Sequence, residues 1–545
     1  MPSIREAAGG ALQHEARGEH REDILRLARG GLLNLAGAAS FGLLGFALTV
    51  MVSRALSSEG VGIFFEFVAL YTFSVTLANL GTSIGLMRAV ARARALGRTA
   101  ELRPLLFVSL APTVGASCVI AVLLFAYAPD LAELFLDQAH REVGVTYLRV
   151  AAPTLPFAAM VMGVLAATRG FGTMLPFNVI ENFGQPSLRL MLGAGLFFGL
   201  ANAWYPALVW AGPSVLALVV ALLWLRFLLS STSPRSLVVE AVPRAPVARE
   251  FWAFTSMRFG AAVLEVLLAW MGVLLLGALN STEDAGIFAA ASRYLLAGML
   301  VNAAIFGVIG PHVGELLAVE DRARVRNVYQ TATVWLVLVT FPVYLLMAVF
   351  APVLMSAFGP NFVDGADALA ILALGMLITM TVGPISALLL MGGRSSWNLF
   401  NTAAALAVNV GLSVVLIPPL GMVGAAISSV ATLLVLNGLL VAQGLVLWRV
   451  HPVGPQYIQA MLAAGLCFGV LALGVRFTLG ASVGSLILAA LAGVPIYGTY
   501  IHLRREALRL PTSSELVSSI LRRDRGLGPA LPSASEIATE GQRRP

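Results

Sequence analysis

The feature that most limits the fold of this chain is a long series of apolar stretches. Stretches of about 18 to 27 residues with very few charges recur between residues 31 and 502. Because about 20 apolar residues in a helix cross the hydrocarbon core of a bilayer, each stretch predicts one membrane span. The chain is therefore expected to be an all-α polytopic membrane protein with about fourteen transmembrane helices. We place these helices at 31–53, 61–86, 105–127, 144–168, 177–200, 204–228, 254–279, 286–313, 328–350, 366–391, 397–417, 421–447, 457–477 and 481–502.

The composition excludes the other common classes. Of the 545 residues, 58% are hydrophobic and only 12% are charged, about half the charged share of a soluble domain. A soluble protein of this size could not cover its surface with so few charges, so ordinary globular, coiled-coil and disordered chains are excluded. The first apolar run is long enough to span a bilayer and is followed by many more, so we expect it to be a retained helix and not a cleaved signal.

Arginine residues orient the helices through the positive-inside rule. Arg is frequent in five of the segments outside the predicted helices: the N-terminal segment, the second, sixth and eighth connections, and the C-terminal tail. If successive helices cross the membrane in opposite directions, all five lie on the same side of it. The opposite side is acidic, with Asp130, Glu133, Glu283 and Asp364 among its residues. We therefore expect a protein of the bacterial cytoplasmic membrane with both termini in the cytoplasm. Topology then explains the net charge of +7, and no nucleic-acid partner is needed.

An internal repeat divides the chain. The tripeptide Gly62-Ile63-Phe64 recurs 224 residues later as Gly286-Ile287-Phe288, and Ala128-Pro129 recurs as Ala351-Pro352. Arg169 and Trp224 match Arg394 and Trp448 at nearly the same offset. Each short match carries little weight, but a shared offset indicates a duplicated unit of six helices. Six is an even number, so the two copies should form parallel bundles related by an axis along the membrane normal.

This repeat gives the expected domain organisation. Two equivalent bundles commonly enclose a cleft, and rocking of one against the other gives alternating access, although a channel or a scaffold could be duplicated in the same way. We expect a cytoplasmic N-terminal segment at 1–30, a first six-helix bundle at 31–229, a cytoplasmic linker at 230–253, a second bundle at 254–450, two additional helices at 451–503 and a disordered, Arg-rich cytoplasmic tail at 504–545.

Few charged side chains lie inside the predicted helices. Each costs about 2.5–3.5 kcal/mol near the bilayer centre, so a retained one should face the protein interior or a wet cavity. The fifth predicted helix carries Glu181, Gln185 and Arg189 at spacings of four, which places them on one face. The seventh carries Arg258 and Glu265, which are seven residues apart and also share a face.

Two further buried charges occupy related places in the repeat. Glu66 lies four residues after Gly62, and Arg293 lies seven residues after Gly286, so they should project from equivalent faces of the two bundles. A guanidinium can bind two phosphate oxygens at once, which makes an Arg in the cleft a candidate anion ligand. A structural ion pair remains the alternative. The candidate anion ligands are Arg293, Arg258 and Arg189, and the candidate coupling-ion or polar cleft residues are Glu66, Glu265, Glu181 and Gln185.

No catalytic or metal chemistry is predicted. The two cysteines, Cys118 and Cys467, lie in apolar runs, so we expect them to be small residues of the core. The six histidines are scattered and lack the paired spacing of a metal site. No Walker motif occurs. We therefore expect no metal, no cofactor and no enzyme activity.

Four stretches carry a resemblance to a known family. They are Ser53–Phe64, Arg169–Leu190, Leu275–Tyr294 and Gly392–Ser428. The last is the most specific, because a Gly-Arg turn is followed by an Asn-bearing helix, a Pro break and a Gly-x-x-Gly-Ala-Ala run. Over residues 25–450 the chain resembles the polysaccharide transporters, that is, the Wzx-like O-antigen flippases of lipid-linked oligosaccharides. That family shares a superfamily with the lipid II flippases and the multidrug and toxin extrusion (MATE) exporters.

The resemblance implies a MATE-like fold and export of a lipid-linked saccharide diphosphate for the cell envelope, as in lipopolysaccharide O-antigen synthesis. It also implies drive by H⁺, Na⁺ or the membrane potential, contact with membrane lipids, and work alongside polysaccharide polymerase machinery. One position departs from the family pattern. Many members carry an Asp in the seventh helix where this chain has Gly272, and Glu265 one to two turns earlier is the candidate substitute.

Two other functions compete with the flippase. A MATE-type small-molecule or drug antiporter would share the fold. The pockets of such antiporters often carry acidic residues that bind cationic drugs. Here the three intramembrane Arg residues match or outnumber the intramembrane acidic residues, which favours the flippase. A membrane polymerase or ligase is disfavoured, because the predicted outer loops are short.

Overall fold

The structure is a computed structural model. It describes residues 35–198, 202, 204–232, 243–318, 321–391, 395–452 and 454–504. The chain divides into two units; the larger is 33–497, and 498–504 is the only described part of the smaller one. Four parts of the predicted organisation lie outside the described residues. They are the N-terminal segment 1–30, residues 233–242 of the linker, the tail after Arg504, and Arg394, the residue that matches Arg169 in the repeat.

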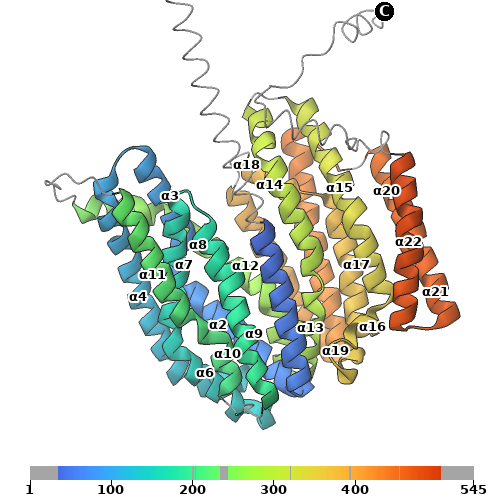
Figure 1. Cartoon of the computed structure of the whole chain (residues 1–545), viewed down its shortest axis with the longest axis horizontal. Coiled ribbons are helices and arrows are strands. Elements are labelled where there is room, and N and C mark those ends of the chain that lie inside the picture. Colours follow the sequence, from blue (N-terminus) through green and yellow to red (C-terminus); the bar gives the residue numbers. More distant parts are fainter. Residues whose placement is uncertain are drawn as a thin grey trace, which may run out of the picture. The chain divides into compact units, whose positions relative to one another are not determined.

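All regular elements of the described ranges are helices (Figure 1). Twelve helical spans in these ranges, some of which join two or more elements, are long and apolar enough to cross a membrane. The predicted all-α membrane class is therefore confirmed, whereas the count of fourteen helices is not. The first half contains the helix Leu35–Ala55, α2 (Ser58–Asn79), α3 (Thr82–Ala95), α4 (Leu102–Ala126), α5 (Ala128–Phe135), α6 (Arg141–Ala151), α7 (Leu155–Gly170), α8 (Leu175–Phe177), α9 (Gln185–Gly193), α10 (Tyr205–Ala211) and α11 (Pro213–Thr232).

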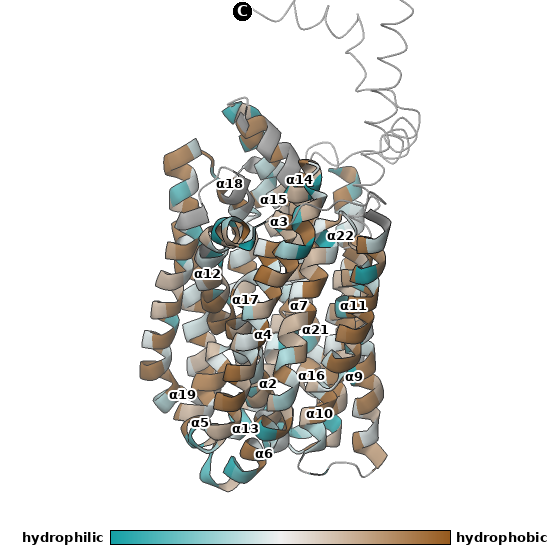
Figure 2. Cartoon of the chain, turned by 90° about the vertical axis from the view of Figure 1, so that its left-hand side faces the viewer, coloured by the Kyte–Doolittle hydropathy of each residue, from teal (hydrophilic) through white to brown (hydrophobic). Residues whose placement is uncertain are grey.

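The second half begins with one long helix that spans the end of the linker. It contains α12 (Arg244–Leu279), α13 (Thr282–Arg293), α14 (Leu296–Ala318), α15 (Arg322–Val349), α16 (Ala351–Met355), α17 (Ala366–Val382), α18 (Ile385–Met391), α19 (Ser395–Trp448), α20 (Pro455–Ala464), α21 (Leu471–Leu479) and α22 (Val483–Leu503). Hydrophobic residues, coloured brown in Figure 2, recur along the helices of the chain. Phe477 and Val446 are 85% and 77% exposed, as expected for side chains that face lipid.

Two segments bear on the helix count. The expected fifth helix is divided into α8, a π-helix at Asn178–Gly184, α9 and a 3-10 helix at Ala194–Phe198. Pro186 is the second residue of α9, and its ring and missing N–H disrupt the regular α-helical ladder one turn earlier. The expected eleventh and twelfth helices share the label α19, but they are two helices that meet at Gly421 (φ 54°, ψ −130°), just after Pro418 and Pro419. Hydrogen bonds from Asn401 to Gln443 and from Asn409 to Thr432 join the two arms side by side.

Helix α2 is the core of this unit. It packs against α4, α7, α12 and α13, and its buried residues lie on all sides of the helix. A helix that is apolar all round needs this central place. Its N-cap is Ser57, whose side chain accepts from the Gly60 N–H at 3.2 Å. The equivalent residue of the repeat, Ser281, caps α13 in the same way by accepting from the Asp284 N–H at 3.1 Å.

Helix α12 contacts both halves of the repeat. Its first part lies on α3, where a Cβ built on Gly85 would come within 2.1 Å of the Thr255 hydroxyl oxygen. Its later part lies on the second half, because a Cβ on Gly272 would contact Phe288 at 3.1 Å and Ser429 at 3.7 Å. The sequence boundary at residue 254 therefore does not separate two independently packed bundles, and the expected domain limits stay a prediction.

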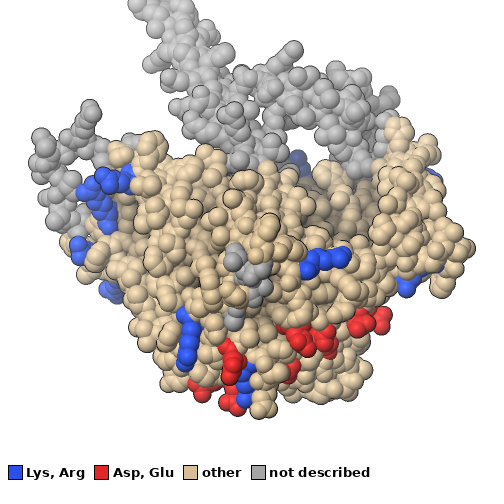
Figure 3. All heavy atoms as spheres, turned by 60° about the horizontal axis from the view of Figure 1, so that its bottom comes forward, with Lys and Arg blue, Asp and Glu red and all other residues tan. Residues whose placement is uncertain are grey.

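Acidic side chains gather at one end of the unit, toward the bottom of Figure 3. They lie in the first turns of α2 and α13, in α5 and in the connection from α5 to α6, and they include Glu59, Glu133, Asp137 and Glu283. We name this the acidic end, and it is the one that the charge pattern predicts to lie outside the cell.

Candidate functional site

The two halves of the repeat meet where α2 crosses α13. A Cβ built on Gly286 would lie 2.5 Å from the Gly62 nitrogen, and one built on Gly62 would lie 1.8 Å from the Thr282 carbonyl oxygen. Only glycine allows two helix backbones to come so close. The contact brings together the two glycines that begin the repeated Gly-Ile-Phe tripeptide.

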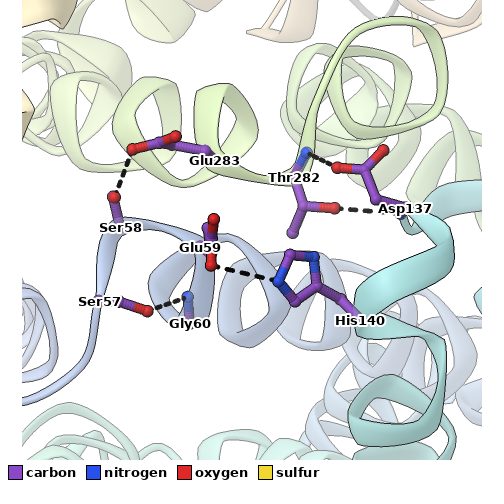
Figure 4. A network of polar contacts seen from close by, with 8 residues as sticks. All are labelled: Ser57, Ser58, Glu59, Gly60, Asp137, His140, Thr282 and Glu283. Atoms are coloured by element: carbon purple, nitrogen blue, oxygen red, sulfur yellow. Dashed lines mark hydrogen bonds and ion pairs between the residues drawn. The ribbon is translucent and has the colours of Figure 1, made fainter.

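Four polar residues join the halves at the acidic end, and we call them the cross-repeat network (Figure 4). The Ser58 hydroxyl donates to the Glu283 carboxylate at 2.5 Å. The Asp137 carboxylate accepts from the Thr282 N–H at 3.1 Å, and the Asp137 N–H donates to the Thr282 hydroxyl at 3.3 Å. The first turn of α13 has N–H groups without intrahelical acceptors, so an Asp from the other half satisfies one of them and interacts favourably with the helix dipole.

Another cross-repeat contact comes from the end of the first helix. The Arg54 guanidinium donates to the carbonyl oxygens of Ser356 and Ala357, both at 3.0 Å, just after α16 ends. The Phe46 ring packs against Tyr294 and Phe358 at 5.1 and 5.5 Å between centroids. Since Phe46 and Arg54 belong to the first half, this end of the unit is held closed by contacts from the first helix, α2 and α13.

Glu66 lies about two helical turns along α2 from this closed end. Its side chain is 1% exposed, and neither carboxyl oxygen has a hydrogen-bond partner among the described residues. It occupies the space beside Gly277 of α12, where an added Cβ would meet the Glu66 Oε1 at 1.8 Å and the Phe135 carbonyl oxygen at 2.8 Å. A buried carboxyl group among acceptors is costly to keep ionised, so this place suits a group that holds a proton or a cation.

Arg293 ends α13 and lies between two aromatic rings. Its guanidinium carbon is 5.0 Å from the ring centre of Phe65 in α2 and 5.1 Å from that of Trp270 in α12. Its Nε is buried and has no hydrogen-bond partner in the described ranges. Stacking fixes the guanidinium plane and leaves its N–H donors available for two oxygens of an anionic ligand.

Glu66 and Arg293 do not form the structural ion pair that the sequence left open; no described residue forms an ion pair with either of them. Each packs instead against α12, Glu66 at Gly277 and Arg293 at Trp270. These two α12 positions are seven residues apart, which is about 10 Å along the helix. A carboxyl group and a guanidinium thus lie along one face of α12, near the contact of the two halves.

The other predicted residues of α12 lie toward its first part. Arg258 is partly buried, and its Nε lacks a hydrogen-bond partner among the residues described. Glu265 is exposed. The structure does not bring either one into contact with Glu66 or Arg293.

The predicted stripe on the fifth helix stays within the first half. The Gln185 amide donates to the Glu181 carboxylate at 2.6 Å. The Arg189 Nε donates to the Trp210 carbonyl oxygen at 3.1 Å, and its guanidinium lies 4.0 Å from the Trp210 ring centre. These contacts tie α9 to the π-helix and to α10, so Glu181, Gln185 and Arg189 have hydrogen-bond partners, which Arg293 lacks among the described residues.

Sequence reasoning missed the cross-repeat network. Ser58, Asp137, Thr282 and Glu283 lie in or beside loops and carry no motif of their own. One usable signal was present, since the serines at 57 and 281 begin equivalent helices. No group of three or more His, Cys, Asp or Glu in the described part could hold a metal ion.

A family model and two curated relatives match the sequence. The model of the family described as "Polysaccharide biosynthesis protein" covers residues 51–364. Stage V sporulation protein B of Bacillus subtilis (strain 168) is 23% identical over 180 residues, which are 32% of this chain and only 35% of that protein. An uncharacterized membrane protein of Methanocaldococcus jannaschii is 20% identical over 410 residues, 71% of this chain and 77% of that protein.

Solved structures show the same fold. The lipid II flippase MurJ, in an inward closed conformation, has a TM-score of 0.67 and 13% identity, and the match covers 88% of this chain and 99% of that one. An inward-facing multidrug resistance MATE family transporter has a TM-score of 0.59 and 14% identity, over 80% and 98% of the two chains. These matches confirm the expected MATE-like architecture. Because the family model covers more than half of the sequence, the chain belongs to the polysaccharide biosynthesis protein family.

Proposed function

We propose that the protein moves a polyprenyl-linked saccharide, or a polysaccharide repeat unit, across the cytoplasmic membrane by alternating access. The observation that carries this proposal is Arg293, a stacked and unpaired guanidinium beside the contact of the two halves. A diphosphate that joins a sugar to a lipid offers the oxygens that such a group binds. Family membership and the fold shared with a lipid II flippase support the same substrate class.

The closed acidic end supports transport from the cytoplasm to the outside. If that end faces the outside, as the distribution of Arg predicts, the cross-repeat network keeps the outer side shut while the substrate binds from the cytoplasm. Release then requires Ser58 to leave Glu283 and Asp137 to leave Thr282. Arg258 and Arg189 are the further candidate ligands for the anionic head, while the polyprenyl chain stays in lipid.

An ion gradient or the membrane potential drives the cycle in this proposal. Glu66, buried close to the network, is the foremost candidate to hold H⁺ or Na⁺, and Glu265, Glu181 and Gln185 are further candidates. The protein is proposed to be a transporter without catalytic activity that lies in a bacterial inner membrane with cytoplasmic termini. It would deliver its substrate to polysaccharide polymerase machinery on the outer side.

A MATE-type small-molecule antiporter is the second candidate function, because two-bundle exporters of that type share the fold. The aromatic-stacked Arg293 argues against a pocket for cationic drugs, since like charges repel. The two functions differ in what a deletion strain accumulates. A flippase deletion should build up a lipid-linked glycan on the inner leaflet, and the intact gene should clear it. Absence of such an intermediate, together with gained drug sensitivity, would favour the antiporter.

A further inference from the structure

A pocket lies where the start of α12 packs on α3 and on the first turn of α4, at the end opposite the cross-repeat network. Its volume is about 270 Å³. None of the candidate transport residues lines it. The charged side chains that line it are Arg88, Arg92, Arg98, Glu101 and Glu250.

The charges of this pocket are not balanced. Arg92 pairs with Glu250 across the contact of α3 and α12, and Arg98 lies 3.7 Å from Glu101. Arg88 has no carboxylate or hydrogen-bond acceptor among the described residues, and its guanidinium carbon lies 4.0 Å from the Phe254 ring centre. One positive charge is therefore uncompensated, and stacking on Phe254 holds its plane in place.

The chemistry of the side chains that line the pocket indicates which class of ligand it can bind. A stacked guanidinium presents its N–H donors at its edge, which fits two oxygens of a phosphate. The wall beside it is apolar and includes Leu96, Leu105, Val247 and Phe251. A free phosphate gains nothing from these side chains, whereas a phosphate attached to a hydrocarbon chain does. By the same distribution of Arg that orients the helices, this pocket lies at the cytoplasmic surface of the membrane, where anionic lipids concentrate.

We propose that this pocket binds the phosphate of an anionic lipid headgroup from the cytoplasmic leaflet. Arg88 binds the phosphate oxygens, and the apolar wall contacts the first part of the attached chain. The lipid touches both α3 and the start of α12, so it stabilises the docking of α12 on the first half of the repeat. This site does not depend on the transported substrate, and it can exist whichever of the two transport functions holds.

The test measures lipid binding to the full-length protein purified in detergent, by native mass spectrometry during titration with phosphatidylglycerol. Arg88→Gln should weaken phosphatidylglycerol binding about tenfold or more, the typical effect of losing a charge-assisted contact. Phe254→Leu keeps every charge but removes the stacking partner, and it should weaken binding several-fold. Arg103→Gln is the matched control, because it removes the same charge from the start of α4 without lining the pocket.

Each outcome bears on the proposal. Selective loss in Arg88→Gln and Phe254→Leu supports it. Equal weakening in Arg88→Gln and Arg103→Gln would show a diffuse charge effect and overturn it. Phosphatidylcholine that binds as tightly as phosphatidylglycerol would also overturn it, and so would displacement of the lipid by an equal concentration of inorganic phosphate, which would assign the pocket to the free ion. If Arg88→Gln does not fold, the comparison of Phe254→Leu with Arg103→Gln decides the matter.

Discussion

Gly62 and Gly286, which occupy equivalent positions in the sequence repeat, lie against each other where α2 crosses α13. Their contact places the repeated Gly-Ile-Phe tripeptides at the junction between the two halves. Two halves related by rotation about an axis along the membrane normal would bring equivalent residues together in this way. The side chains that close the acidic end are arranged around it.

Substitution of Gly62 by Ala should destabilise the protein. The new methyl group would lie 1.8 Å from the Thr282 carbonyl oxygen, and this neighbour is backbone that cannot rotate away. We expect a loss of about 1–3 kcal/mol, typical of overpacking, seen as a lower Tm in detergent. Gly115→Ala in α4 is the control, because no atom lies within 4 Å of its added methyl group. An equal fall in Tm for both variants would refute the tight crossing.

A cross-link across the two halves should stop transport. Ser58→Cys with Glu283→Cys places two thiols where a hydroxyl and a carboxylate now touch, and a short cleavable cross-linker would prevent the acidic end from opening. Transport should return when the linker is cleaved. Glu59→Cys with His140→Cys is the control, since this pair lies 3.3 Å apart within the first half alone. Undiminished transport by the Ser58–Glu283 cross-linked protein would show that this end does not open.

Glu66→Gln should remove the coupling of transport to the proton gradient without destabilising the protein. The amide keeps the shape of the side chain but cannot ionise, and the carboxyl group that it replaces has no described hydrogen-bond partner to lose. We expect an unchanged or higher Tm together with transport that no longer responds to external pH. Glu265→Gln, at an exposed position of α12, should keep the original response. A pH profile in Glu66→Gln that matches the parent would exclude Glu66 as the coupling site.

Removal of Arg293 should lower transport at least tenfold at normal membrane levels, because a charge-assisted contact with the substrate phosphates is lost. Arg293→Lys should rescue it only in part, since Lys keeps the charge but not the planar, stacked fork. Transport rates of Arg293→Ala and Arg258→Ala, corrected for protein in the membrane, provide the measurement. Full activity in both Ala variants would eliminate the anion site.

Most of the fold could be predicted from hydropathy. Apolar length alone locates the membrane helices, since a bilayer sets one thickness for all of them. The main exception follows from backbone chemistry that hydropathy does not register. Pro186 lies inside the expected fifth helix, and the segment around it is divided into α, π and 3-10 parts. By contrast, Pro418 and Pro419 signal the break at Gly421 between the expected eleventh and twelfth helices, where the backbone is not helical.

The candidate site was less predictable, because its partners are far apart in sequence. The spacing of Glu66 and Arg293 indicated a shared face but not what they contact. Arg293 lies between Phe65 and Trp270, which are 228 and 23 residues away, and aromatic residues are too common in a membrane protein for sequence to single these out. Asp137 lies in an ordinary acidic loop, and only the folded chain places it at the first turn of α13.

The attachment of α12 to both halves has a mechanical consequence. Opening of the acidic end would carry Gly277 away from Glu66, while the first part of the same 36-residue helix stays docked on α3. The helix must then bend, and Gly260, with no atom within 4 Å of a built Cβ, lies just after the docked part. The balance between inward-open and outward-open states therefore includes the elastic energy of one helix, and a change in its stiffness would shift that balance without altering any contact at either end.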